Sequence, residues 1–199
     1  MKTLFIALIF LITASVLLSQ EKTILSGEVE HGGYGAPVVK FTQIHDQFGL
    51  LLGGRGGWII NHTFAMGIGG YGLVNKIDLD DTIFDYANRL MMGYGGFEIE
   101  IIINSDEIVH FTFHALIGGG AINYWDEDYF HNVHWDSWET ADEFFVAEPS
   151  FNVDMNITSF FRIGIGAGYR FISGVELVGL TNEDLAGLSG NIIFKFGSF

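Results

Sequence analysis

Ionisable residues recur at every second position in segments of this chain that are otherwise apolar. Glu98 and Glu100 alternate with phenylalanine and isoleucine, and His110 and His114 alternate with valine, phenylalanine and alanine. Such side chains could pair as ions, line a narrow polar path for solutes, or gate such a path through protonation of the imidazoles, whose usual pKa is about 6.5. We predict one charge network, which comprises Arg55, Glu98, Glu100, His110, His114, Glu148, Asp154, Arg162, Arg170 and Lys195, with Lys40 as a further cation.

Two polar segments are rich in carboxylates, whose oxygens could bind a hard divalent cation. The segment 76–90 lacks the glycine and the closing glutamate of an EF-hand loop. The segment 121–142 also contains His131 and His134, which could ligate a transition metal together with Asp136. A solvated acidic surface explains both segments more simply, so we predict no metal and no cofactor. The carboxylates concerned are Asp78, Asp80, Asp81, Asp85, Asp126, Glu127, Asp128 and Asp136.

Tryptophans cluster in the second acidic segment. Aromatic side chains dominate binding hot spots, so Trp135 and Trp138 are candidates for binding an external ligand. Trp125 is closer to an expected strand end and suits the aromatic girdle of a membrane barrel.

Hydrolytic chemistry has little support in the sequence. Three histidines, His62, His110 and His114, have no serine at a suitable position, and no G-x-S-x-G motif occurs. The chain also contains no cysteine, which excludes a thiol nucleophile, a disulfide framework and a lipoprotein anchor. We therefore predict that the protein is not an enzyme.

Strands must position these side chains. In the segment 162–171, apolar or aromatic residues alternate with arginine and glycine, and a strand sends these two sets to opposite faces. Pro37 predicts an irregularity in the first strand. Seven further segments have a strand pattern or carry the same alternation, so we expect eight strands, over 27–44 (interrupted at Pro37), 48–58, 63–72, 92–103, 108–119, 143–155, 162–171 and 188–199.

The connections between these strands also alternate. Those after the second, fourth and sixth strands are tight, and those after the third, fifth and seventh are longer. Short turns at one end and longer loops at the other are typical of outer-membrane barrels, whereas a soluble sandwich has no reason to produce them. A charge on the lipid face would cost roughly 2–4 kcal/mol, so the charged parity should face the lumen. We predict an all-β fold, an eight-stranded antiparallel up-and-down transmembrane barrel.

The beginning of the chain has the features of a secretory leader. Lys2 precedes a nearly continuous apolar run, 4–18, and Ser19-Gln20 offers a cleavage point. We expect a signal peptide over 1–19 and a barrel domain over 20–199. The 199 residues include 24 acidic and 9 basic ones, a balance that excludes nucleic acid as a partner.

Four segments resemble the small eight-stranded outer-membrane barrels of the OmpA, OmpX and OmpW type, and more closely short barrels of Bacteroidetes-type bacteria. The segments are GGYGAPVVKF (32–41), GGRGGWIINHTF (53–64), YRFISGV (169–175) and FKFGSF (194–199). The resemblance implies contact with outer-membrane lipid, an aromatic C-terminus, Phe199, that the barrel assembly machinery reads, and two periplasmic termini. Lys195 is four residues before Phe199, so a regular strand would send both side chains to the same, charged face. Either a bulge therefore lies near Gly197, or Phe199 turns out of the strand.

The function expected from these features is structural, or interaction at the cell surface through acidic, aromatic outer loops. A narrow channel for small solutes is the alternative, and a lipid-modifying outer-membrane enzyme is a third, weaker one.

Overall fold

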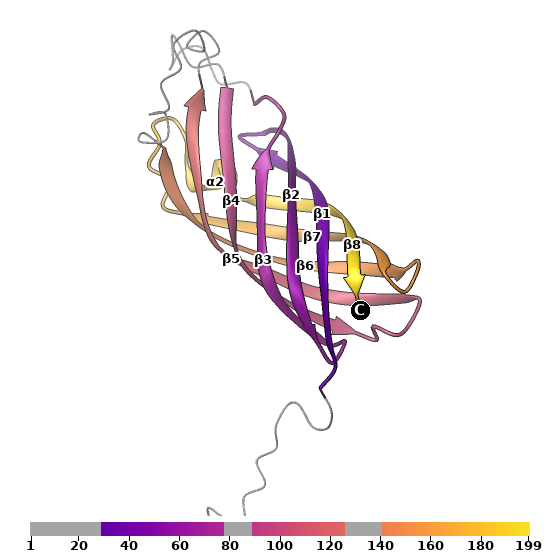
Figure 1. Cartoon of the computed structure of the whole chain (residues 1–199). Helices are drawn as coiled ribbons and strands as arrows, with labels where there is room; N and C mark the ends of the chain where they lie inside the picture. The colour runs from indigo at the N-terminus through magenta and orange to yellow at the C-terminus, as the bar shows by residue number, and fades with distance from the viewer. Residues whose placement is uncertain (1–28, 78–88, 126–140) are drawn as a thin grey trace, which may run out of the picture.

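Eight antiparallel strands form a closed barrel in the computed structural model, which describes residues 29–77, 89–125 and 141–199 (Figure 1). Each strand pairs with the next in the chain, and β8 pairs with β1, so no strand edge stays open. This confirms the predicted fold. The elements are β1 (His31–Ile44), β2 (Gln47–Ile60), β3 (Phe64–Leu73), β4 (Arg89–Ile103), β5 (Val109–Trp125), β6 (Asp142–Asn156), β7 (Phe161–Ser173), α2 (Asn182–Leu185) and β8 (Gly187–Ser198).

The two ends of the barrel differ in their connections, as predicted. The short-turn end carries the links 61–63, 104–108 and 157–160, together with the start of β1 and the end of β8 (Figure 1). The long-loop end carries the links 74–88, 126–141 and 174–186 and one two-residue turn. In that turn His45 and Asp46 both have positive φ, of 49° and 59°, as a tight hairpin of matching twist requires.

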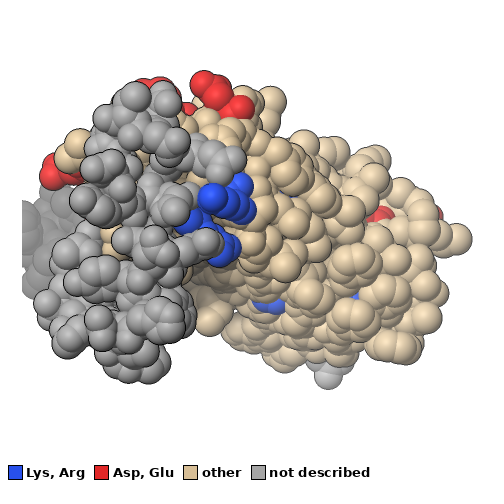
Figure 2. All heavy atoms as spheres, turned by 90° about the horizontal axis from the view of Figure 1, so that it is seen from above, with Lys and Arg blue, Asp and Glu red and all other residues tan. Residues whose placement is uncertain are grey.

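The alternation along each strand separates an apolar outside from a polar inside. On β4, Phe97 and Ile101 are 52% and 51% exposed, whereas Glu98 and Glu100 are 2% and 1% exposed. Seen from above, residues other than Lys, Arg, Asp and Glu cover most of the visible wall of the barrel (Figure 2). Among the described residues, no helix is both long enough and apolar enough to cross a membrane.

The first strand is not interrupted at Pro37, but the predicted irregularity is confirmed in its ladder with β8. β1 continues through Pro37, which keeps its place opposite Gly54 of β2. Only the ladder with β8 is affected, because it forms the pairs Gly35–Phe196 and Val38–Ile193 without pairs between them. Proline lacks an N–H to donate on one side of the strand but leaves the other ladder intact. Pro149 of β6 has the same effect on its ladder with β7.

Five strands, β2, β4, β5, β6 and β7, are longer than the pattern predicts, and β5 is extended most. β4 begins at Arg89 rather than at 92, and β5 continues to Trp125 rather than ending at 119. The glycines at the end of the predicted fifth strand pair with both β4 and β6, and the strand continues beyond them. The segment ahead of β6 lies outside the described residues.

Candidate functional site

The predicted charge network lies inside the barrel. All of its members are exposed by 7% or less, as is Lys40. They come from every strand except β3 and extend from the short-turn end through the middle of the barrel to Arg170, near the long-loop end. We call this set the ionic layer: Lys40, Arg55, Glu98, Glu100, His110, His114, Glu148, Asp154, Arg162, Arg170 and Lys195.

Glu100 is the centre of the ion pairs. Its Oε2 accepts a hydrogen bond from Lys195 Nζ at 3.0 Å, and its Oε1 lies 2.9 Å from Arg55 Nη2. The Tyr34 hydroxyl donates to the same Oε1 at 2.5 Å. Lys195 Nζ also donates to Asp154 Oδ2 at 3.0 Å, so it bridges two carboxylates from different strands. These contacts connect β1, β2, β4, β6 and β8 across the lumen.

A second group of contacts surrounds Glu148. Lys40 Nζ and the Tyr94 hydroxyl donate to its Oε2 at 2.9 and 2.6 Å, and Ser189 Oγ donates to its Oε1 at 3.1 Å. Lys40 Nζ also lies 3.4 Å from the centre of the Tyr71 ring, a cation–π contact. The carboxylate and the ammonium are therefore both paired, as buried charges require.

The two interior histidines have different partners. His114 Nδ1 lies 3.1 Å from Ser150 Oγ, and its Nε2 lies 3.3 Å from Glu98 Oε2. His110 Nε2 is 3.9 Å from Asp154 Oδ2. The expectation that no serine accompanies these histidines is wrong, because the β5–β6 register places Ser150 directly opposite His114. Ser150, His114 and Glu98 are thus in contact in the order of a serine–histidine–carboxylate triad. Glu98 and His114 are, however, buried among interior side chains, where their contacts connect neighbouring strands.

Two arginines of the ionic layer form no ion pair with a described carboxylate. Near the long-loop end, Arg170 Nε donates to the carbonyl of Leu185 at 2.8 Å. At the short-turn end, Arg162 lies 3.5 Å from His110 Nε2 and 3.4 Å from the Ser105 carbonyl oxygen. Among the described interior residues, five lysines and arginines face four carboxylates, so the positive charge is in excess.

Glycines make room for the long interior side chains. At Gly69 a Cβ would collide with the Glu98 carboxylate, and at Gly164 it would collide with the Asp154 carboxylate. The inward positions of β7 between its two arginines are glycines, and the side chains of β6 pack directly against their backbone. This is the local reason for the R-I-G-I-G-A-G-Y-R pattern of residues 162–170.

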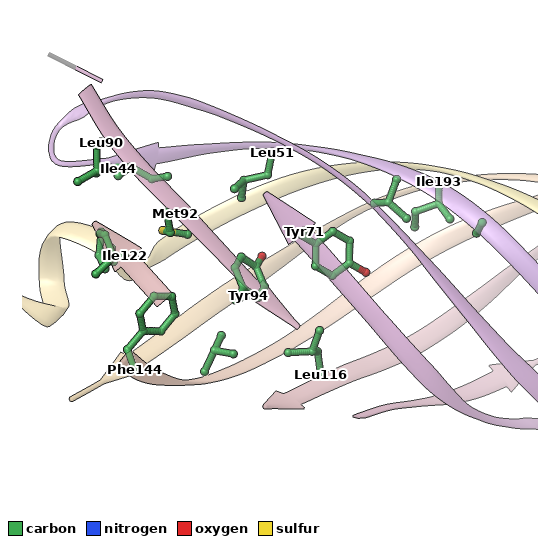
Figure 3. Close-up of a cluster of buried hydrophobic side chains, with 14 of the residues drawn as sticks. Ile44, Leu51, Tyr71, Leu90, Met92, Tyr94, Leu116, Ile122, Phe144 and Ile193 are labelled. Carbon is green, nitrogen blue, oxygen red and sulfur yellow. The ribbon is translucent and has the colours of Figure 1, made fainter. Parts of the chain in front are cut away.

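An apolar layer closes the long-loop end of the barrel. Figure 3 shows Ile44, Leu90, Met92 and Ile122 together at one end of the buried cluster, with Tyr94 beyond them. Loop residues add to the strand residues here. The apolar layer comprises Ile44, Leu51, Ile77, Leu90, Met92, Ile122, Phe144, Leu180 and Leu185.

Carboxylates attach the loop 174–186 to the barrel. Asp142 of β6 accepts hydrogen bonds on its Oδ2 from the Glu176 and Leu177 N–H groups, at 2.6 and 2.7 Å. The other carboxylate is Asp184. Its Oδ1 lies 3.0 Å from His45 Nδ1, and its Oδ2 accepts hydrogen bonds from Thr181 N and Oγ1, both at 2.7 Å. Partial burial opposes ionisation, but the Thr181 hydrogen bonds and then the His45 contact outweigh it and hold the pKa of Asp184 below its usual value. Leu185, which follows, is fully buried.

Sequence reasoning missed the polar partners of the charges. Tyr34, Tyr71 and Tyr94 each donate a hydroxyl to a buried glutamate, and Thr112 Oγ1 donates to Asp154 at 2.6 Å. The sequence could have revealed three of them, because Tyr34, Tyr94 and Thr112 each lie an even number of residues from a charged residue of the same strand and so face the same side. Phe199 follows the end of β8 without a bulge, and its ring covers the Arg162 guanidinium at 4.0 Å, so it lies at the short-turn mouth of the lumen.

Several predicted features lie outside the described residues: the leader 1–19, the loop carboxylates from Asp78 to Asp85 and from Asp126 to Asp136, His131, His134, Trp135 and Trp138. Trp125 is the last residue of β5. Among the residues that the structure describes, no three His, Asp or Glu side chains are placed to hold a metal ion.

No protein-family model matches the chain, and no curated protein matches its sequence. Its fold, however, is similar to that of solved barrels. The N-terminal β-barrel domain of Pseudomonas aeruginosa OprF has a TM-score of 0.57 at 9% identity, over 85% of this chain and 99% of that one. Neisserial surface protein A has a TM-score of 0.57 at 9% identity, over 86% and 99%. The outer membrane protein OprG from Pseudomonas aeruginosa has a TM-score of 0.53 at 6% identity, over 84% and 95%. At these identities the similarity concerns the fold.

Proposed function

We propose that the protein is a sealed barrel of a bacterial outer membrane, with a structural or surface-interaction role through its acidic, aromatic outer loops. Its apolar outer wall supports a membrane location, because exposed isoleucine and phenylalanine side chains face outward along the strands. The solved barrels with this fold include a protein described as an outer membrane protein. The short-turn end, with both chain ends, would then face the periplasm.

The observation that carries the proposal is the closure of the interior by two different layers. The ion pairs of Glu100 and Glu148 cross the lumen, and every charged residue that forms them is exposed by 6% or less. Beyond them the apolar layer fills the long-loop end. An eight-stranded barrel is only wide enough for its side chains to fill it. Both layers argue against a path for solutes.

The outer loops carry the interaction role in this proposal. Trp135 and Trp138 stand among carboxylates in the segment 126–140 and offer aromatic anchors for an external partner. This segment connects β5 to β6, so the barrel would present both tryptophans at the long-loop end. Lipid contact and assembly by the outer-membrane barrel machinery belong to the same proposal, as does removal of residues 1–19.

Four measurements test the proposal. Electrophoresis in detergent with and without boiling should show a fast-migrating folded form that boiling converts, because closed barrels resist unfolding in detergent. A monomer that dissolves in buffer without amphiphile and keeps its β-rich spectrum would contradict the membrane location. In planar bilayers we expect no steady current, and reproducible conductance would contradict the sealed interior. A mass change of lipopolysaccharide incubated with the refolded protein would support the enzymatic alternative instead.

A further inference from the structure

A pocket of about 530 Å³ opens at the short-turn end of the barrel, apart from the outer loops. Arg162 and Phe199 form its inner side, and the turns 104–108 and 157–160 supply its rim. Ser105, Thr158 and Ser159 are among the residues that line the pocket, as is His62. The pocket therefore combines a cation with several hydroxyl groups.

Arg162 differs from the other arginine that lacks a carboxylate partner. Arg170 is fully buried, and the Leu185 carbonyl accepts its Nε hydrogen bond. Arg162 is also buried, at 7% exposure, but it lines the pocket, and its polar contacts are long, at 3.4 and 3.5 Å. The Phe199 ring lies against the guanidinium and orients it. A buried guanidinium without an ion pair is costly unless an anion compensates its charge.

The rim is held in place by side-chain hydrogen bonds. Asn156 Nδ2 donates to the carbonyls of Ser105 and Glu107, at 3.0 and 2.7 Å, and so joins the two turns beside Arg162. Thr158 Oγ1 accepts a hydrogen bond from the Phe160 N–H at 3.3 Å, which leaves its own proton free to be donated. Asp106 also lines the pocket, and its carboxylate is exposed.

We infer that this pocket binds a phosphate group. A guanidinium presents a planar pair of donors that fits phosphate oxygens, and serine and threonine hydroxyls complete such a site. The phosphate would come from an anionic phospholipid headgroup of the surrounding leaflet or from free phosphate. Three apolar side chains on the same two links, Ile108, Ile157 and Phe160, are 71%, 47% and 60% exposed and would meet the acyl chains. The lipid source rests on the proposed membrane function, whereas the free-phosphate source does not.

The test is a titration of the isotope-labelled full barrel, refolded in uncharged maltoside micelles and followed by amide chemical shifts. One arm adds inorganic phosphate, with chloride at equal ionic strength as the salt control, and the other adds short-chain phosphatidylglycerol. We expect saturable shifts confined to residues 104–108 and 157–160. Binding in the first arm identifies free phosphate as a ligand, and binding only in the second identifies the headgroup. Absence of saturable shifts in both arms overturns the inference.

Variants assign the binding to Arg162. Arg162→Gln should weaken binding at least tenfold, Arg162→Lys should restore part of it, and Asp106→Asn should strengthen it. Arg89→Gln removes the same charge at the long-loop end, where β4 begins, and should have no effect. Equal binding by wild type and Arg162→Gln would overturn the inference. Each variant is first checked for heat-dependent gel mobility; if Arg162→Gln does not fold, the double variant Thr158→Ala, Ser159→Ala should still weaken binding severalfold. Loss of that mobility in the wild type would contradict the membrane proposal alone.

Discussion

The ionic layer and the apolar layer fill the same barrel but depend on different parts of the chain. The contacts among the charges of the ionic layer are made by strand residues, whose positions the ladders hold in register. The apolar layer also needs Ile77, Leu180 and Leu185, which come from the loops. The charges stabilise the barrel only in matched pairs, whereas the apolar side chains contribute by volume and by removal from water. The stability of the ionic layer therefore depends on the pairing of its charges, and that of the apolar layer at the long-loop end depends on docking of the loops.

Breaking the centre of the ionic layer should have the largest effect. Glu100→Gln removes the carboxylate that pairs with Arg55 and one of the two that pair with Lys195. We expect a loss of about 3–5 kcal/mol in the free energy of unfolding. Urea unfolding of the refolded protein in micelles measures it. The double variant Arg55→Met, Glu100→Met should recover part of the loss because it removes both charges. A loss below about 1 kcal/mol in Glu100→Gln would show that pairing does not govern this layer.

Cavities in the apolar layer come next. Leu51→Ala, on β2, should reduce the free energy of unfolding by about 2–4 kcal/mol through lost burial and the cavity left behind. Leu185→Ala should instead act mainly on the loop 174–186, raising its amide exchange more than that of the strands. Equal exchange in loop and strands of Leu185→Ala would contradict the dependence on loop docking. The outward-facing Leu52→Ala is the matched control for Leu51→Ala, since Leu52 is 46% exposed, and should have the smaller effect.

Single hydrogen bonds within the ionic layer should matter less. Ser150→Ala leaves His114 Nδ1 without its partner, and the expected loss is about 1–2 kcal/mol, measured by the same urea unfolding. Ser159→Ala, at an exposed turn position, is the control and should be neutral. A loss of 3 kcal/mol or more in Ser150→Ala, as an order-of-magnitude bound, would place this contact on a par with the ion pairs.

The smallest effect should be the pH dependence of loop docking. Because the pKa of Asp184 is lower in the folded protein, its stabilising contribution is present above the unfolded value of about 3.9 and is lost as the pH falls below it. Amide exchange in 174–186, corrected for intrinsic rates, should rise severalfold from pH 6 to pH 3. Asp184→Asn should reduce this dependence and should leave exchange in β1 to β8 unchanged. A rise of equal size in the variant would exclude Asp184 as its cause.

The glycines and prolines mark where sequence patterns were sufficient and where they were not. The sequence was sufficient to place the glycines of β7 on the same face as Arg162 and Arg170, because a strand alternates its faces whatever its neighbours are. Pro37 was only a partial guide, because its effect depends on which ladder its missing N–H would have joined. Likewise, Ser150 could be matched to His114 only through the β5–β6 register.

By itself, the sequence determined which side chains face inward. A side-chain period of two is local, and a strand needs no partner to express it. Only the tertiary structure decided which of those side chains meet. Lys195 of β8 lies between Glu100 of β4 and Asp154 of β6, and Tyr34 of β1 reaches the same glutamate. These contacts join residues far apart in the chain, and they depend on the stagger between strands and on closure of β8 onto β1, which set the levels at which side chains face one another across the lumen.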